Sequence, residues 1–79
     1  MSIAPIVRSA EVIRALLKAG FKIVRQRGSH VHLEHIVDST RITQVSVHSK
    51  PLPRWLLATI LRQARISMEE FVKLLRNKN

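Results

Sequence analysis

The spacing of apolar residues changes twice along this 79-residue chain, and these changes limit the folds that it can adopt. Before Gly20 and again after Pro53, apolar residues recur every three to four positions, the spacing of a helix with one buried face. Between those points they alternate with polar residues, which is the spacing of a strand with one buried face. The sequence therefore predicts a small sheet, preceded and followed by helices.

The first helix is expected over residues 10–19. Ser9 is placed to cap its N-terminus, and Gly20 supplies the left-handed residue with which many helices end. The apolar residues expected on its buried face are Val12, Ile13, Leu16 and Leu17.

Three antiparallel strands are expected next, at residues 21–26, 30–35 and 41–47. In the first, Phe21 and Ile23 occupy the buried side, while Lys22 and Gln26 face the other way. The first turn is formed by Arg27, Gly28 and Ser29, and the second loop, residues 36–40, contains Asp38, Ser39 and Thr40. The residues expected to alternate on the buried side of the third strand are Thr43, Val45 and Val47.

Two helices are expected to close the chain. Pro51 and Pro53 break the chain and restart it as a helix that runs to about Arg65. Ser67 and Glu70 form a capping box for a third, shorter helix. The apolar residues of these two helices are Leu56, Leu57, Ile60, Leu61 and Ala64, then Phe71, Val72, Leu74 and Leu75. The order α-β-β-β-α-α predicts one α+β domain, residues 1–79, with an antiparallel sheet covered by helices on one face.

Charge indicates the kind of partner. Fourteen Lys and Arg against five Asp and Glu give a formal net charge of +9, which favours a polyanion such as nucleic acid or an acidic protein. The chain is too short for a deep pocket, so any active site must be shallow. There is no cysteine and no apolar stretch long enough to span a membrane, so we expect a cytoplasmic protein.

Alternation in the second strand predicts which side chains are available for chemistry. Val31 and Leu33 are expected to face the helices, so His30, His32 and Glu34 must face outward. Two imidazoles are then exposed on one face of the sheet. Taken singly, an exposed histidine of this kind is most simply a solvated polar residue.

The third strand adds another histidine to that face, because Gln44, Ser46 and His48 alternate with its buried residues. Antiparallel pairing puts His30 opposite a residue between Ser46 and His48. His30 and His48 are therefore expected to be neighbours.

Two imidazoles beside basic side chains suit RNA cleavage without a metal ion. One takes the proton of the 2′-hydroxyl, the other protonates the leaving 5′-oxygen, and Arg or Lys stabilises the charge on phosphorus. A carboxylate site for two metal ions is not expected, because the five acidic residues form no cluster. A zinc site at His30, His32 and His48 is the other alternative, although residues two apart on a strand are about 7 Å apart at Cα and no carboxylate is placed to orient the histidines. Trp55, the only tryptophan, is interpreted first as a packing residue and second as a partner anchor.

The chain resembles the HicA toxins over nearly its whole length. The resemblance rests on an opening helix followed by Ala19-Gly20-Phe21, on Gly28-Ser29-His30 at the first turn, on Val45-Ser46-Val47-His48, and on residues 60–71. It implies a fold like that of double-stranded-RNA-binding domains and an mRNA-cleaving toxin that halts translation. It also implies neutralisation by a HicB antitoxin, and it places the catalytic histidine at His30.

The chain departs from that family's pattern in three places. Family members often have proline where Ser46 stands, glycine near Trp55 and glycine where Arg65 stands, so the start and end of the second helix are expected to differ. The region before that helix offers one arginine, Arg54, where double-stranded-RNA binders typically present a lysine cluster. Single-stranded RNA is therefore the expected substrate.

These arguments assign catalysis to His30 and His48, with no cofactor and no metal. The residues expected to bind substrate are Gly28, Ser29, Arg25, Arg27, His32 and Lys50. Arg25 and Arg27 are expected to contact both RNA phosphates and antitoxin carboxylates; the other candidate basic patch is Lys50, Arg54 and Arg62. The free toxin is expected to be a monomer. A non-catalytic basic RNA-binding module is the main alternative, followed by a DNA-binding or ribosome-associated protein.

Overall fold

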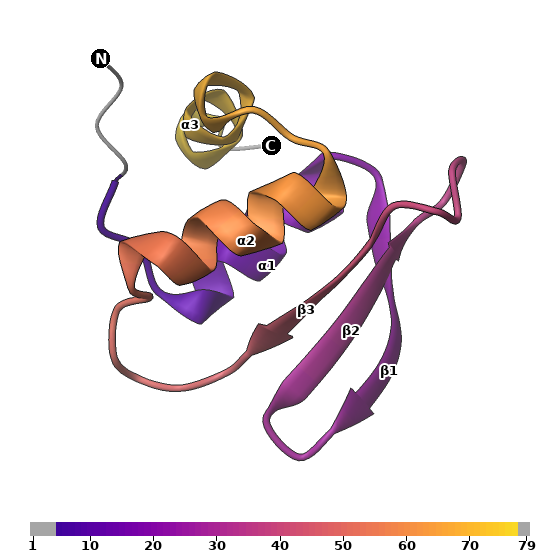
Figure 1. Cartoon of the computed structure of the whole chain (residues 1–79), viewed down its shortest axis with the longest axis horizontal. Coiled ribbons are helices and arrows are strands. Elements are labelled where there is room, and N and C mark those ends of the chain that lie inside the picture. Colours follow the sequence, from indigo (N-terminus) through magenta and orange to yellow (C-terminus); the bar gives the residue numbers. More distant parts are fainter. Residues whose placement is uncertain (1–4, 78–79) are drawn as a thin grey trace.

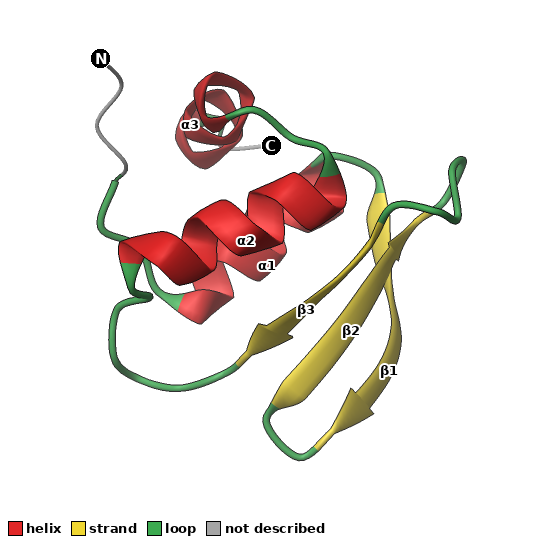
Figure 2. Ribbon diagram, in the orientation of Figure 1, coloured by secondary structure: helices red, strands yellow, loops and turns green. Residues whose placement is uncertain are grey.

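The computed structural model describes residues 5–77, which form a three-stranded antiparallel sheet with helices on one face (Figure 1). Helix α1 (Ser9–Lys18) precedes strands β1 (Phe21–Arg27), β2 (His30–His35) and β3 (Ile42–Ser46). Helices α2 (Arg54–Ala64) and α3 (Met68–Arg76) follow. The strands lie in chain order, so β2 is central and β1 and β3 are the edges. The expected α+β class and element order are confirmed (Figure 2).

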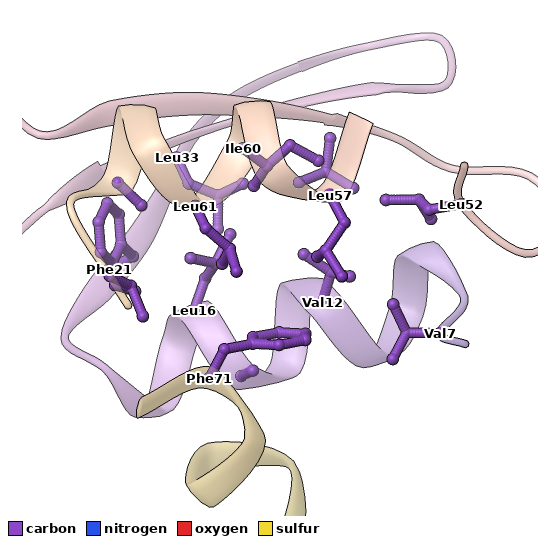
Figure 3. Close-up of a cluster of buried hydrophobic side chains, with 14 of the residues drawn as sticks. Val7, Val12, Leu16, Phe21, Leu33, Leu52, Leu57, Ile60, Leu61 and Phe71 are labelled. Atoms are coloured by element: carbon purple, nitrogen blue, oxygen red, sulfur yellow. The ribbon is translucent and has the colours of Figure 1, made fainter. Parts of the chain in front are cut away.

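The core lies between the sheet and its helices (Figure 3). Helix α1 packs against β1 and β3, α2 packs against β3, and α3 packs on α1 and α2. Leu33 of β2, Leu16 of α1 and Phe71 of α3 have no exposed surface, so one apolar cluster joins the sheet, the first helical layer and α3. Burying side chains of this size is what holds so short a chain together, because each contributes about 1.5–3 kcal/mol.

The start of α1 differs from the expected cap. Ser9 is the first residue of the helix and is almost fully buried, and the N-cap is Arg8. The Glu11 carboxylate accepts the backbone N–H of Arg8 at 2.9 Å. The Ser9 hydroxyl instead makes hydrogen bonds with the backbone of His48, 39 residues away. A serine before a helical pattern predicts a local cap, and here a tertiary contact uses its hydroxyl.

The strands depart from the expected pattern at both edges. β1 extends to Arg27, and Phe21 is its one buried residue, because Ile23 is half-exposed although it lies opposite Leu33. A bulge between Ile23 and Arg25 shifts the register, so Gln26 lies opposite Val31 and its expected place on the face of Lys22 is wrong. β3 ends at Ser46, so Val47 lies beyond the strand and is 41% exposed rather than buried. Edge strands have neighbours on one side only, which the alternation of residue types does not reveal.

Two helical predictions also need correction. Trp55, in the first turn of α2, is 69% exposed, so its interpretation as a packing residue is wrong. Leu17, expected on the buried face of α1, is 44% exposed. Ser67 does cap α3, where its hydroxyl accepts the backbone N–H of Glu70 at 3.0 Å.

The loop between β2 and β3 is fastened to the C-terminal end of α2. Arg65, the C-cap of α2, adopts the left-handed conformation with φ +58°, and its guanidinium pairs with Asp38 at 3.3 Å. Arg41 donates from Nε to the carbonyl of Ala64 at 2.8 Å, which satisfies an unpaired carbonyl of the last turn. Arg65 stands where family members often have glycine, and it adopts the left-handed conformation of this turn while its guanidinium pairs with Asp38. The turn is therefore formed without glycine at this position.

His35 closes the same end of the sheet. Its Nδ1 accepts the backbone N–H groups of Val37 and Asp38, so the proton of the neutral ring lies on Nε2, which donates to the carbonyl of Ala19 at 3.2 Å. The imidazole also packs edge-on against Phe21, with ring centroids 5.1 Å apart. Gly20 leaves the space that the ring needs, and its φ of +99° suits glycine alone.

Replacement of Gly20 by alanine should therefore destabilise the domain by more than 1 kcal/mol, because a Cβ there would lie 2.9 Å from Nε2 of His35 and the backbone would be strained. Gly28→Ala is the matched control: Gly28 also has a positive φ, but a Cβ there would meet nothing within 4 Å. Urea unfolding of both variants measures the difference. If both variants lost the same free energy of unfolding, the contact with His35 would not contribute to the effect of Gly20→Ala.

Asp38 gives a second prediction. Hydrogen bonds from the hydroxyl and backbone N–H of Thr40, and then the charges of Arg65 and Arg41, lower the pKa of Asp38 below its ordinary value of 3.8. A carboxyl with a lowered pKa stabilises the fold above its unfolded pKa and loses that contribution as the pH falls through the folded pKa. The stability difference between the wild type and Asp38→Asn should be constant above pH 5 and should shrink below about pH 4. Urea unfolding at a series of pH values tests it, and a difference independent of pH would contradict it.

Candidate functional site

The outer face of the sheet, on the side away from the helices, carries the histidines of β2. Val31 and Leu33 are buried against the helices, so His30 and His32, which alternate with them, face outward. His30 is exposed and His32 is half-buried. The structure thus puts these two predicted site residues on the expected face.

The turn before His30 is tight and well defined. Gly28 and Ser29 alone connect β1 to β2, and Gly28 has φ +55°, as the first position of a type II′ turn requires. The side chain of Gln26 donates to the carbonyl of Gly28 at 3.2 Å, and the Ser29 carbonyl accepts the backbone N–H of Val47 at 2.6 Å. The backbone on either side of His30 is therefore held in place, while its imidazole is open to solvent.

Basic side chains lie opposite both histidines. The register of β1 with β2 pairs Arg27 with His30 and Arg25 with His32, positions at which Cβ atoms are about 5 Å apart. Both arginines are exposed, and in the described part of the chain neither forms an ion pair. Their positive charge is thus available to an anionic ligand beside the imidazoles. Further along the same strands, the register puts Lys22 opposite Glu34.

His48 is placed differently from the prediction. β3 pairs Ser46 with His30, inside the expected interval, but the strand then ends, and His48 follows two residues later. Its backbone N–H donates to Ser9 Oγ and its carbonyl accepts from the same hydroxyl, both at 3.2 Å. Its side chain is exposed, and its contact with His30 stays a prediction.

The segment of residues 47–52 is hydrogen-bonded to the rest of the molecule at four of its six residues. The backbone N–H groups of Val47 and His48 donate to the Ser29 carbonyl and to Ser9 Oγ. The carbonyl of Ser49 accepts a hydrogen bond from the guanidinium of Arg8. The backbone N–H of Leu52 donates to the carbonyl of Val7 at 2.8 Å. The segment thus connects the Gly28–Ser29 turn with the start of α1. Lys50, expected to bind substrate, is exposed on it.

Sequence reasoning missed the residues that hold this segment. The sequence pattern predicts that Ser9 is a helix cap, and nothing in it signals that the Ser9 hydroxyl makes hydrogen bonds with the backbone of a residue 39 positions away. The bond between Ser29 and Val47 continues the pairing of β2 with β3 past the last strand residue. That bond follows from the register and could have been found by extending the predicted pairing by one residue.

Within residues 5–77, no three His, Asp or Glu side chains converge as a metal site would require. Glu34 is the acidic residue on the outer face of β2, and Lys22 lies opposite it. The donor set for the zinc alternative at His30, His32 and His48 is therefore not assembled. No helix in the same range is both long and apolar enough to cross a membrane.

Comparison with known families places the chain. Residues 9–66 match the family model described as the HicA toxin of bacterial toxin-antitoxin systems, a range that runs from the first residue of α1 to just past the C-cap of α2. It includes the whole sheet, the Gly28–Ser29 turn and the 47–52 segment. No curated protein matches the chain. The match covers well over half of the sequence, so the chain belongs to the HicA toxin family.

Proposed function

We propose that this chain is an endoribonuclease that cleaves mRNA without a metal ion, and that it inhibits translation as the toxin of a toxin-antitoxin pair. The observation that carries the proposal is an exposed imidazole, His30, at a rigid turn with Arg27 directly opposite it. Membership of the HicA toxin family supports it, because a toxin of this kind needs a cellular target and an antitoxin. The exposed face offers a long RNA strand access to His30.

The chemistry proposed is attack of the 2′-oxygen on the neighbouring phosphorus, which forms a 2′,3′-cyclic phosphate and releases the 5′-oxygen as a hydroxyl. A base takes the 2′-hydroxyl proton as that oxygen attacks phosphorus, and an acid protonates the 5′-oxygen as its bond to phosphorus breaks. His30 takes one of these two roles and His48 the other. His32 is the alternative to His48. Arg27 and Arg25 stabilise the negative charge that builds on the phosphoryl oxygens.

The antitoxin proposed is an acidic, HicB-type protein that covers the outer face of the sheet. The net charge of +9 favours such a partner and speeds its association. An antitoxin that covers His30, Arg25 and Arg27 would exclude RNA from them. Binding of the antitoxin would therefore by itself inhibit RNA cleavage. The proposed free toxin is a cytoplasmic monomer.

His30→Ala should reduce cleavage of a long single-stranded RNA by at least about 100-fold, because it removes a general acid or base. The domain should keep its stability within about 0.5 kcal/mol, since the side chain is exposed. Cleavage is measured on a gel in the presence of EDTA, alongside thermal unfolding. His32→Ala and His48→Ala in the same assay show which of the two shares the reaction.

Full cleavage by the His30→Ala variant would contradict the catalytic assignment. RNA binding without cleavage by the wild-type protein would favour the alternative, a non-catalytic RNA-binding module. Cleavage that EDTA abolishes and zinc restores would instead favour a metal mechanism.

Reversing the charge of Arg25 and Arg27 together, Arg25→Glu with Arg27→Glu, should weaken both RNA and antitoxin binding. The slope of log affinity against log salt for RNA should fall by about 1.4, since two phosphate contacts of a single strand are lost. The control is Arg14→Glu with Lys73→Glu, which changes the net charge equally at exposed positions of α1 and α3. If both double variants lost affinity equally, net charge rather than this face would determine binding.

A further inference from the structure

Trp55 is a large aromatic side chain that the fold leaves in solvent. It is 69% exposed in the first turn of α2, where its carbonyl accepts a hydrogen bond from the Thr59 hydroxyl at 2.9 Å. Ala58, one turn further along the same face, is exposed and too small to cover an indole. The ring therefore stands on a rigid helix with its surface free, an arrangement that the core does not require.

The surroundings of Trp55 are basic. Arg54 precedes it, Arg62 follows two turns later on the same side of α2, and both are exposed. Neither forms an ion pair with a described residue, and the α2 sequence contains no Asp or Glu. Along the helix axis the two guanidinium-bearing residues are about 12 Å apart. An indole between unpaired cations is complementary to a ligand that combines flat rings with negative charge.

Arg54 and Trp55 lie at the N-terminal end of α2, the end that the chain reaches from the side of the Gly28–Ser29 turn, and Arg62 lies in the last turn of the helix. The C-terminal end of α2 is fixed to the opposite end of the sheet, where Gln63 accepts from Thr43 and Ala64 accepts from Arg41. The N-terminal end of α2 follows the 47–52 segment, which begins at the bond between Val47 and Ser29 (Figure 1). Lys50, exposed on that segment, lies along the chain between the turn and Arg54.

We propose that Trp55, with Arg54 and Arg62, is a second contact for single-stranded RNA, in which an unpaired base stacks on the indole and the arginines hold the flanking phosphates. The proposal rests on the proposed function in taking RNA as the ligand, and it adds a site on the helical side of the molecule. Single-stranded RNA fits because its bases are free to stack on an aromatic ring. A second copy of the chain does not fit, because each copy carries a net charge of +9.

The sequence provides a direct reporter, since Trp55 is the single tryptophan and there is no tyrosine. A short 2′-O-methyl oligoribonucleotide, which cannot be cleaved through its 2′-oxygen, should quench the intrinsic fluorescence as it binds. Heparin, which has the charge but no bases, should bind without comparable quenching. A duplex of the same RNA should quench less than the single strand because its bases are already stacked.

Trp55→Ala should weaken binding of the labelled oligonucleotide by about 5- to 150-fold, the usual effect of losing one stacked base, and Trp55→Phe should lie between that variant and the wild type. The matched control is Val37→Ala, which shortens an 85% exposed apolar side chain at the opposite end of the molecule and should leave affinity unchanged. Thermal unfolding shows that each variant is folded.

Wild-type affinity in the Trp55→Ala variant, or no quenching on binding, would overturn the inference, and continued cleavage of long RNA would then leave the proposed function standing. Quenching by an acidic protein partner but not by RNA would overturn it as well, and would assign Trp55 to a protein interface. Absence of both RNA binding and cleavage would overturn the proposed function together with this inference.

Discussion

The burial of Val31 and Leu33 against the helices determines the rest of this architecture. Because they occupy alternate positions of the central strand, His30 and His32, which alternate with them, must lie on the opposite face. A shift of one residue in the pairing would move both histidines into the core and both apolar residues into water. The candidate chemistry therefore depends on the packing of a side of the sheet that it never touches.

Much of the fold could be predicted from the sequence, because helices and strands with one buried face have different spacings of apolar residues. The outward direction of His30 and His32 follows from the same rule. The rule fails where neighbours are missing or contacts are distant. It cannot show that Val47 lies beyond the end of β3, or that Trp55 has nothing to pack against. The partner of the Ser9 hydroxyl is likewise set by tertiary structure, which no local pattern contains.

The candidate site combines a hydrogen-bonded backbone with exposed side chains. Hydrogen bonds hold the chain on both sides of His30 and at His48, so the positions from which the imidazoles extend are fixed. The imidazoles of His30 and His48 and the guanidinium groups of Arg25 and Arg27 are solvent-exposed. Such a surface can receive a long, flexible strand anywhere along its length, which a deep pocket could not. In such a surface the bound strand itself must do most of the work of bringing its phosphate close to the imidazoles.

The edge strand β1 has a consequence for solubility. An unpaired edge offers backbone N–H and C=O groups to any other strand, and proteins block such edges with bulges and charges. β1 has both, a bulge between Ile23 and Arg25 and the cations Lys22, Arg25 and Arg27. The arginines proposed to bind phosphate are thus also of the kind that opposes the addition of further strands to the sheet. Loss of their charge would leave the exposed Ile23 and Val24 of this edge without neighbouring cations, so we expect a change in ligand affinity there to be accompanied by a change in aggregation.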